Sequence, residues 1–308
     1  MNRINLLNDI YKNPVRKRVE DNIRRIYKNT DVIYNPVSYT VCLNEQLKQT
    51  YDYNKRIRPF LIWLWSIAAW LKQNDVLGEL ATTIELIHQS TLPADDIQDK
   101  SENRCWKQAL WKKVWTNTTI DIILLLAASG PTYYANILWK DKNWILHDYS
   151  DFLLTTLINL VSWQELDLKA NEWWKTIDDY YKIVDGKTGA LLDLALHFGT
   201  MPYEYLYTEE KSQAITEFAM ELARLYQICD DIDDIKKWNK LDPSNIHNYA
   251  DITKNPEKMD KIYQALYNKL EKAHNKLLEL KVVKENYLME LANVLLPKEE
   301  FDIKMLIK

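Results

Sequence analysis

Two clusters of aspartates, far apart in the chain, have the residue types and the spacing that a chemistry of metals and phosphates needs. The first occupies residues 95–99 with the sequence DDIQD, and the second occupies residues 230–234 with the sequence DDIDD. On a helix, the first and fifth residues of each cluster lie on one face about one turn apart, so their carboxylates repel unless a cation lies between them. Mg2+ prefers oxygen ligands and usually binds one or two carboxylates together with the phosphates of a substrate. The two clusters therefore predict a diphosphate clamp.

Acidic runs are more often solvated helix faces than binding sites. Here, however, residues 86–94 and 225–229, directly before the two clusters, are largely apolar. Solvated acidic faces are seldom preceded in this way. We therefore take the aspartates as candidate metal ligands: Asp95, Asp96, Asp99, Asp230, Asp231 and Asp234.

A basic segment offers a place for a second anion. Lys55, Arg56 and Arg58 lie within four residues directly before an apolar stretch that begins at Phe60. If this stretch is a helix, its amino terminus adds a partial positive charge at the same place. Lys55 and Arg58 are therefore candidate substrate-binding residues, although a solvated side chain is the commoner fate of a single basic residue.

Two further cations are candidate contacts for a diphosphate. Arg104 follows Asp99 by five residues, which is close enough to reach a phosphate held by the first cluster. Lys187, followed by Thr188, lies in an apolar segment of helical period. A buried lysine there is costly unless it meets an anion.

The elements that position these residues are predicted to be helices. Apolar residues recur every three or four positions through 76–94, 119–128, 152–168, 177–198 and 212–235, whereas sustained two-residue alternation is absent. The chain has only five glycines and no Gly-rich phosphate loop of an α/β nucleotide-binding fold. We therefore predict an all-α fold. Helix breaks are predicted at 13–14, 35–36, 74–75, 130–131, 199–202, 242–243 and 255–256.

Composition narrows the class of protein. The 308 residues are 47% hydrophobic and 27% charged, which fits a single domain over residues 1–308 with a large buried core. A formal net charge of -4 points neither to nucleic acid nor to an anionic membrane surface. Three cysteines without close spacing argue against a disulfide framework and fit a reducing, cytoplasmic location. The amino terminus lacks a signal-peptide core, and the most apolar stretch, residues 60–71, is too short for a transmembrane segment.

Several motifs, taken in order along the chain, resemble those of the trans-isoprenyl diphosphate synthase (polyprenyl synthetase) family. The resemblance runs from about residue 55 to residue 234. The matching segments are KRIRP at 55–59, His88 with the cluster at 95–99, Arg104, QELD at 164–167, Lys187 with Thr188, and Gln227 with the cluster at 230–234.

The resemblance implies an isoprenoid synthase helical bundle with a deep central cavity, usually a homodimer, that acts on prenyl diphosphates with three Mg2+ ions. It implies ionisation of an allylic diphosphate, followed by head-to-tail condensation with isopentenyl diphosphate. It assigns Mg2+ to Asp95, Asp99 and Asp230, the allylic diphosphate or its metal shell to Arg104, Lys187 and Gln227, and isopentenyl diphosphate to Lys55, Arg58 and His88. Thr188, which forms a pair with Lys187 in the family pattern, is a further candidate substrate-binding residue. The candidate catalytic residues are Asp95, Asp99, Asp230 and Lys187.

Departures from the family pattern keep a second reaction open. Cys105 stands where the family has a second arginine that serves isopentenyl diphosphate, and a thiol cannot replace the paired hydrogen bonds of a guanidinium. The alternative is a terpene synthase (cyclase) on the same fold, which ionises one long prenyl diphosphate without isopentenyl diphosphate. The 12 Trp and 19 Tyr would supply cation–π surface for it. The presence of Lys55, Arg58 and His88 favours the condensing enzyme.

Two other roles are less favoured. The length of the product is indicated by two residues near the first cluster. Prenyl transfer to a non-isoprenoid acceptor and a non-catalytic partner subunit fit poorly, because both aspartate clusters are intact. Ser90 and Thr91 are the fifth and fourth residues before the first cluster, where short-chain members of the family often carry aromatic residues. Small side chains at these positions predict a product of twenty carbons or longer.

Overall fold

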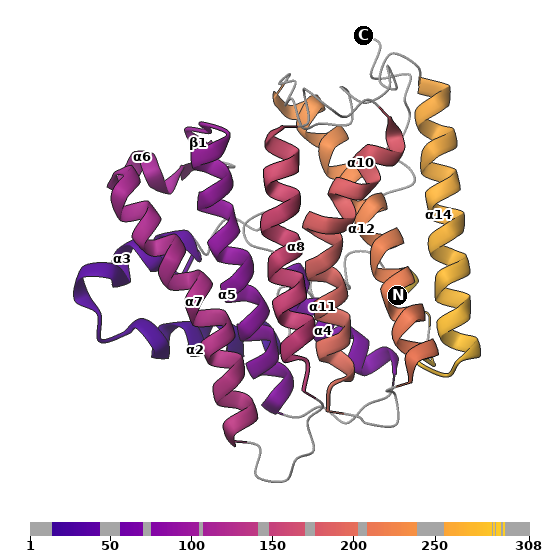
Figure 1. Ribbon diagram of the computed structural model, residues 1–308, viewed down its shortest axis with the longest axis horizontal. Coiled ribbons are helices and arrows are strands. Elements are labelled where there is room, and N and C mark those ends of the chain that lie inside the picture. Colours follow the sequence, from indigo (N-terminus) through magenta and orange to yellow (C-terminus); the bar gives the residue numbers. More distant parts are fainter. Residues whose placement is uncertain are drawn as a thin grey trace. The chain divides into compact units, whose positions relative to one another are not determined.

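The computed structural model describes residues 14–43, 56–69, 75–104, 107–140, 148–169, 176–202, 208–238, 256–284, 286, 288–290 and 292. These residues are helical apart from short connections and one antiparallel ladder, in which β1 (Asn103–Arg104) pairs with β2 (Lys107–Gln108) (Figure 1). The predicted all-α fold is confirmed for this part of the chain.

The helices are, in chain order, α2 (Pro14–Tyr27), α3 (Asp31–Thr40), α4 (Ile57–Ala68), α5 (Asp75–Gln98), α6 (Leu110–Val114), α7 (Thr116–Lys140), α8 (Ser150–Leu168), α10 (Ile177–Val184), the π-helix η2 (Asp185–Gly189), α11 (Ala190–Thr200), α12 (Glu209–Trp238) and α14 (Pro256–Glu279).

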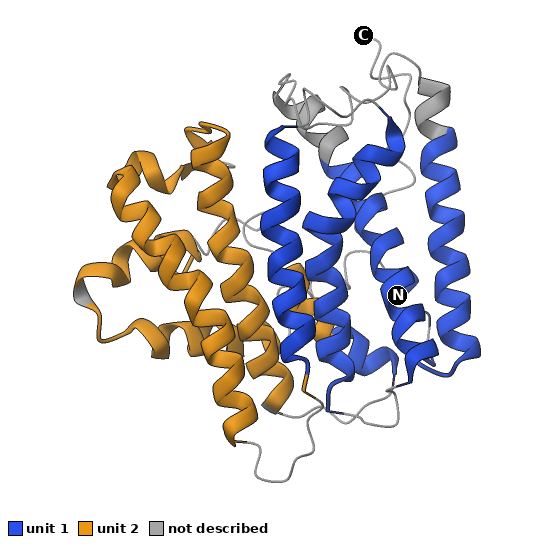
Figure 2. Cartoon of the chain, viewed as in Figure 1, with its two compact units in different colours: residues 1–6, 64–71, 149–308 blue, residues 7–63, 72–148 orange. Residues whose placement is uncertain are grey.

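The chain forms two compact units (Figure 2). Unit 1 comprises residues 1–6, 64–71 and 149–308, and unit 2 comprises residues 7–63 and 72–148. The first aspartate cluster belongs to unit 2, and the second belongs to unit 1. The single domain and the central cavity stay predictions.

In unit 2, α5 packs against both α2 and α7. Ile23 of α2 and both Ile122 and Leu126 of α7 are fully buried. Gly130 allows α7 to approach α5 closely, because a Cβ atom at this position would lie 2.5 Å from Cγ1 of Ile87. The packing on both sides gives α5 a defined position, and α5 carries His88 and the first aspartate cluster.

Two predicted helix breaks are wrong, because Pro36 lies inside α3 and Pro131 lies inside α7. A proline in a helix interior removes a hydrogen bond, at a cost of about 3 kcal/mol. Burial around each proline offsets this cost: Val37 follows Pro36, and Gly130 and Tyr134 flank Pro131. The end of α11 at Thr200 confirms the break at 199–202. The breaks at 13–14, 74–75, 242–243 and 255–256 fall wholly or partly outside the described residues and stay predictions.

In unit 1, α11 is buried along its whole length and runs antiparallel to α12. Oγ1 of Thr216 donates a hydrogen bond to Oδ2 of Asp193 (3.2 Å), and Nε2 of His197 lies 3.0 Å from Oγ of Ser212. The later residue of α11, His197, thus contacts the earlier residue of α12, Ser212, as expected for two helices that run in opposite directions. The contacts therefore hold the two helices in one register.

Among the described helices, α7 is the one that is long and apolar enough to cross a membrane by length and composition alone. The most apolar stretch of the sequence, residues 60–71, instead overlaps α4, which has 12 residues (Ile57–Ala68). Core helices of soluble proteins meet the same criterion, and α7 buries Ile122, Leu126 and Tyr134 within unit 2. The absence of a transmembrane segment stays a prediction.

Candidate functional site

The first aspartate cluster forms the last turn of α5 and the turn that ends it. Lys100 adopts a left-handed conformation with a φ of 54°. The Ser101 N–H donates to the carbonyl of Asp96 (2.9 Å), and the Lys100 N–H donates to the carbonyl of Ile97 (3.3 Å). These two bonds form the Schellman motif, which terminates a helix. The carboxyl terminus of a helix carries a partial negative charge, so the helix end and the carboxylates together favour a cation.

Asp96 and Arg104 form an ion pair within this cluster. The Asp96 side chain is buried, and its Oδ1 accepts a hydrogen bond from Nε of Arg104 at 2.9 Å. Arg104 also donates from Nη2 to the carbonyl of Leu92 (3.1 Å). Asp95 is half-buried and Asp99 is exposed. The buried carboxylate therefore holds Arg104 in place, and the two outer carboxylates are the more accessible ones.

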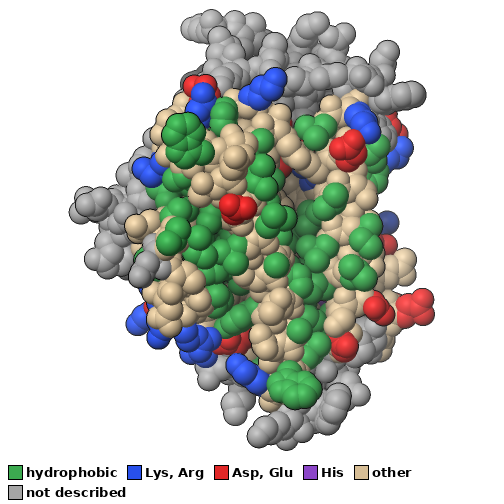
Figure 3. Space-filling view, turned by 60° about the vertical axis from the view of Figure 1, so that its left-hand side comes forward, with side chains coloured by type: hydrophobic (Ala, Val, Ile, Leu, Met, Phe, Trp, Pro, Cys, Tyr) green, Lys and Arg blue, Asp and Glu red, His purple; other side chains and the backbone are tan. Residues whose placement is uncertain are grey.

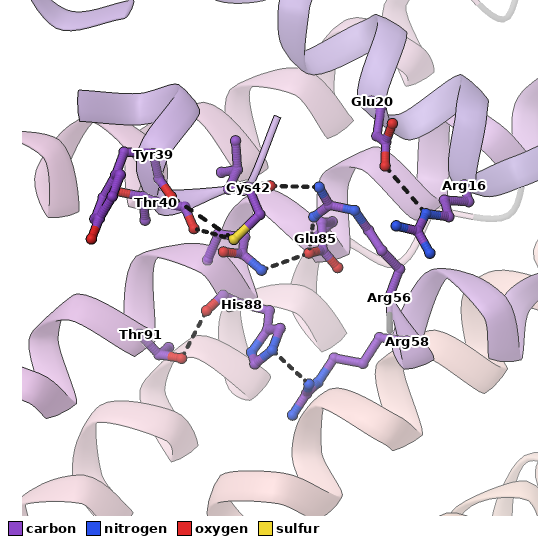
Figure 4. A network of polar contacts seen from close by, with 12 residues as sticks. Arg16, Glu20, Tyr39, Thr40, Cys42, Arg56, Arg58, Glu85, His88 and Thr91 are labelled. Atoms are coloured by element: carbon purple, nitrogen blue, oxygen red, sulfur yellow. Dashed lines mark hydrogen bonds and ion pairs between the residues drawn. The ribbon is translucent and has the colours of Figure 1, made fainter. Parts of the chain in front are cut away.

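Arg58, at the start of α4, and His88, in α5, contact each other (Figure 4). Nη1 of Arg58 lies 2.9 Å from Nε2 of His88. A guanidinium only donates hydrogen bonds, so Nε2 must accept, and the imidazole is neutral with its proton on Nδ1. Burial lowers the pKa of His88 well below its usual value, and the guanidinium groups of Arg58, Arg104 and Arg56 lower it further. The pair therefore carries a single positive charge, on Arg58.

A buried ion pair connects the start of α4 to α5 (Figure 4). Arg56 pairs with Glu85, and both side chains are 1% exposed. Oε1 of Glu85 also accepts a hydrogen bond from Nε2 of Gln89 (2.7 Å). Arg56 has a φ of 49°, which is uncommon for a residue other than glycine. Because Arg58 follows Arg56 by two residues and His88 follows Glu85 by three, the buried pair also positions the contact between Arg58 and His88.

In unit 1, Lys187 and Thr188 lie in the π-helical turn η2. Nζ of Lys187 lies 2.5 Å from Oδ2 of Asp167 in α8, and the Asp167 side chain is only 7% exposed. Oγ1 of Thr188 donates a hydrogen bond to Oε1 of Gln227 in α12 (2.8 Å). Three segments that the sequence marked separately therefore meet at η2. Turns of this kind are rare and are often found at functional sites.

The glycines of η2 allow neighbouring helices to pack closely against its backbone. A Cβ atom at Gly186 would lie 1.8 Å from Cδ1 of Trp163 in α8. A Cβ atom at Gly189 would lie 2.7 Å from Sδ of Met220 in α12. The turn that carries Lys187 is therefore held between α8 and α12.

The second aspartate cluster lies in α12. Asp230 follows Gln227 by three residues and is exposed. The side chains of Asp231 and Asp234 lie outside the described part of the chain, as do Lys55 and Cys105. The roles predicted for these residues stay predictions.

The accessible aspartates fit Mg2+, although they do not form a closed metal site. Among the described residues, no group of three or more His, Cys, Asp or Glu side chains could hold a metal ion. Mg2+ does not need such a group, because it usually takes one or two carboxylates and completes its coordination with phosphate oxygens and water. Asp95 and Asp99, at the negative end of α5, carry carboxylate oxygens, which are the type of ligand that Mg2+ takes.

Three charged residues in these contacts belong to none of the motifs recognised in the sequence: Glu85, Asp185 and Arg224. Arg224 of α12 donates hydrogen bonds to both carboxylate oxygens of Asp185. Glu85 lies in the segment ATTIELI and Arg224 in the segment LARLYQI. A charge in such apolar surroundings needs a partner. That signal indicates that Glu85 and Arg224 form ion pairs, but it does not identify the residues with which they pair.

Comparison with solved structures identifies the fold. The geranyltransferase from Legionella pneumophila has a TM-score of 0.73 at 20% sequence identity, over 95% of this chain and 96% of that chain. The geranylgeranyl pyrophosphate synthetase from Pyrococcus horikoshii Ot3 has a TM-score of 0.68 at 20% identity, over 96% of this chain and 98% of that chain. The chain therefore has the all-α isoprenoid synthase fold.

Comparison of sequences identifies the family. The short chain isoprenyl diphosphate synthase of Methanocaldococcus jannaschii is 25% identical over 301 residues, which cover 95% of this chain and 85% of that protein. Residues 41–255 match the model of the polyprenyl synthetase family. Because this match covers more than half of the 308 residues, the chain belongs to the polyprenyl synthetase family.

Proposed function

We propose that the protein is a Mg2+-dependent isoprenyl diphosphate synthase, which condenses an allylic prenyl diphosphate with isopentenyl diphosphate. The observation that carries the proposal is the contact between Arg58 and His88. It offers an anion site in a chain that has a second set of diphosphate-binding candidates, Lys187, Thr188 and Gln227. An enzyme that used a single diphosphate would need only one such set. The related protein from Methanocaldococcus jannaschii, a short chain isoprenyl diphosphate synthase, supports the same reaction.

The allylic diphosphate is the proposed ligand of the aspartate clusters and of η2. Mg2+ bound by Asp95, Asp99 and Asp230 would supply positive charge that stabilises the departing diphosphate. Lys187 adds a cation to the same ligand, and its ion pair with Asp167 orients the ammonium group.

Arg104 and Gln227 complete the proposed contacts to this diphosphate. Arg104 is oriented by its hydrogen bond to Asp96. Oε1 of Gln227 accepts the hydrogen bond from Thr188. The amide nitrogen of Gln227, which only donates, is therefore the atom that we assign to an oxygen of the diphosphate.

Isopentenyl diphosphate is the proposed ligand of Arg58, His88 and Lys55. Arg58 supplies the positive charge, and the neutral His88 holds the guanidinium by accepting its hydrogen bond. Nδ1 of His88 is buried and has no hydrogen-bond partner among the described residues. A phosphate oxygen would satisfy this donor, whose burial otherwise costs about 1–3 kcal/mol.

The reaction breaks one bond and forms another. The carbon–oxygen bond of the allylic diphosphate breaks, and its electron pair leaves with the diphosphate, so an allylic cation remains. The double bond of isopentenyl diphosphate donates its electron pair to this cation, which forms the new carbon–carbon bond. The resulting tertiary cation loses a proton, which we assign to an oxygen of the released diphosphate. The products are a longer prenyl diphosphate and inorganic diphosphate.

We propose a product of twenty carbons or longer, on the basis of two small residues in α5. The hydroxyl of Ser90 donates to the carbonyl of Ile87 (2.7 Å), and the hydroxyl of Thr91 donates to the carbonyl of His88 (2.9 Å). Both hydroxyls are thus satisfied within their own helix, and neither residue places an aromatic ring one turn before the first aspartate cluster.

We also propose that the partner of the chain is a second copy. In unit 2, α7 exposes Ile120 and Leu124, and in unit 1, α8 exposes Leu154, Ile158 and Val161. Apolar side chains are exposed on the surface of the protein (Figure 3). Monomeric proteins rarely expose large apolar patches, and homodimer interfaces are apolar. The homodimer that the family resemblance implies would cover these rows.

The proposed function is tested by incubating the purified protein with Mg2+ and an allylic diphosphate of 10, 15 or 20 carbons, with and without isopentenyl diphosphate. Longer diphosphates, formed only when isopentenyl diphosphate is present, are the expected products. A hydrocarbon or an alcohol released without isopentenyl diphosphate would establish the cyclase instead. Products that stop below twenty carbons would overturn the proposed chain length, and no turnover of any substrate would overturn the proposed function.

A further inference from the structure

Arg224 of α12 and Asp185, the first residue of η2, form a two-point ion pair. Nε of Arg224 lies 2.7 Å from Oδ1 of Asp185, and Nη2 lies 2.5 Å from Oδ2. The remaining nitrogen, Nη1, donates to Oε1 of Glu221 (2.7 Å). A planar guanidinium that binds both oxygens of one carboxylate fixes the angle between the partners as well as their distance.

The surroundings of this ion pair reduce screening by water. The side chains of Arg224 and Asp185 are 20% and 27% exposed. The ring of Tyr181 lies beside the guanidinium, with 5.4 Å between the ring centroid and Cζ of Arg224. Burial raises the pKa of Tyr181 to about 12, so this ring stays neutral at physiological pH. The interaction is therefore stronger than that of a fully solvated surface pair.

The pair is attached to the π-helical turn by its backbone as well as by its charge. The N–H of Ala190 donates to the carbonyl of Asp185, which is the five-residue hydrogen bond that defines a π-helix. Asp185 therefore accepts the backbone bond that closes η2 and the side-chain bonds that tie η2 to α12. Arg224 precedes Gln227 by three residues in α12, and Gln227 accepts the hydrogen bond from Thr188.

We propose that Arg224 and Asp185 are positioning residues for the diphosphate site: they hold η2 in its π-helical form, so that Lys187 and Thr188 contact the same ligand as Gln227. The proposal rests on the proposed function, because Lys187 and Gln227 are taken as contacts of the allylic diphosphate. Without the pair, η2 can relax to a regular α-helix. Each residue of an α-helix turns the chain by about 100°, so a shift of one residue would direct Lys187 away from its ligand.

The proposal is tested with two variants of Arg224. Arg224→Gln removes the charge and the two-point contact. Arg224→Lys keeps the charge but loses the planar group that donates two hydrogen bonds to one carboxylate. The measurements are kcat, the KM of each substrate, and the Kd of a non-ionisable allylic thiodiphosphate in the presence of Mg2+. Arg224→Gln should weaken binding of the thiodiphosphate about tenfold, because an ion pair that orients a ligand group is lost, and it should leave the KM of isopentenyl diphosphate unchanged. Arg224→Lys should have an intermediate effect.

A matched control separates positioning from stability. Thr216→Val removes a hydrogen bond between α12 and Asp193 of α11, in the same helix pair but away from η2. It should lower the Tm and leave the Kd of the thiodiphosphate unchanged. If Arg224→Gln lowers the Tm in the same way and also leaves the Kd unchanged, the pair is merely structural and the proposal is overturned.

A second variant keeps the test valid if Arg224→Gln does not fold. Asp185→Asn keeps the shape of the side chain and removes its charge, so it should weaken thiodiphosphate binding to a smaller extent. The double variant should bind the thiodiphosphate no more weakly than Arg224→Gln alone, because the two substitutions remove the same contact. Unchanged binding in Asp185→Asn would overturn the proposal.

Failure of this proposal can be told apart from failure of the proposed function. A wild-type protein that neither binds the thiodiphosphate nor turns over prenyl diphosphates overturns both. A wild-type protein that does both, with variants of unchanged Kd, overturns only the positioning role of Arg224 and Asp185.

Discussion

Arg56 and Glu85 form an ion pair in which each side chain is 1% exposed. Removing one member leaves the other as a buried, unpaired charge, which typically costs about 3–5 kcal/mol. We therefore expect Glu85→Ala to lower the free energy of unfolding by about this amount, measured by urea denaturation. Glu102→Ala is the control, since Glu102 pairs with Lys112 at the surface, where the two side chains are 64% and 35% exposed. That variant should change stability by less than about 1 kcal/mol, and equal losses in both variants would contradict the prediction.

The aspartate clusters are expected to be essential for turnover but not for folding. Asp95→Asn and Asp230→Asn should each reduce turnover by several orders of magnitude, because a ligand that helps to stabilise the departing diphosphate is lost. Circular dichroism should show unchanged helix content. Asp121→Asn, an exposed acid in α7, is the control and should keep wild-type turnover. Near-normal turnover in both cluster variants would end the diphosphate interpretation.

Arg58 is expected to serve one substrate only. Arg58→Ala should raise the KM of isopentenyl diphosphate about ten- to hundredfold, as expected for one charge-assisted hydrogen bond. The KM of the allylic diphosphate should change little. Arg24→Ala removes a half-buried arginine that pairs with Asp21 on α2 and should alter neither constant. Equal increases in both constants for Arg58→Ala would assign Arg58 a structural role.

His88 should make the protein less stable as the pH falls below about 6.5. The folded-state pKa of His88 is lowered by burial and by the neighbouring arginines, whereas the unfolded chain takes up a proton at about pH 6.5. The unfolded state therefore binds more protons below that pH, and stability that is present above it is lost as the pH falls. Thermal unfolding between pH 7.5 and 5 should show a falling Tm for the wild type and a flatter profile for His88→Gln. Parallel profiles would show that His88 titrates normally in the folded protein.

The exposed rows of α7 and α8 should lie in an interface between two copies of the chain. Leu124 is 63% exposed, and Leu124→Glu would bury a charge in such an interface. We expect sedimentation equilibrium to give a dimer for the wild type and a monomer for this variant. Lys182→Glu, on the polar surface of α10, should remain a dimer. A wild-type protein that sediments as a monomer at all concentrations would refute the prediction.

Local pattern allowed the helices and the motif residues to be predicted, but not their partners. The spacing of Asp95 and Asp99 is a helical spacing, so their shared face follows from the sequence alone. Arg56 and Glu85 are 29 residues apart, and Lys187 and Asp167 are 20 apart. Such pairings depend on how the helices pack, and no local pattern encodes them.

The two wrong predictions of helix breaks, at 35–36 and 130–131, have the same cause. A proline or a glycine signals a helix end only when local propensity decides the outcome. At Pro131, burial of Tyr134 and Ile137 on the following turn decides it instead. The end of α5 was equally hidden, because the left-handed residue that terminates it is Lys100 and not the usual glycine.

Gly186 shows how strongly packing can restrict a residue that performs no chemistry. Its backbone lies directly against the indole ring of Trp163, so a side chain at residue 186 would overlap that ring. When every residue is substituted in turn, replacements of Gly186 should therefore lower activity as severely as replacements in the aspartate clusters, since any side chain displaces the turn that carries Lys187. A smaller residue at position 163 would relieve this intolerance, whereas no second change would restore a lost metal ligand. Sensitivity to substitution in this region thus has two separate origins, and only compensating changes distinguish them.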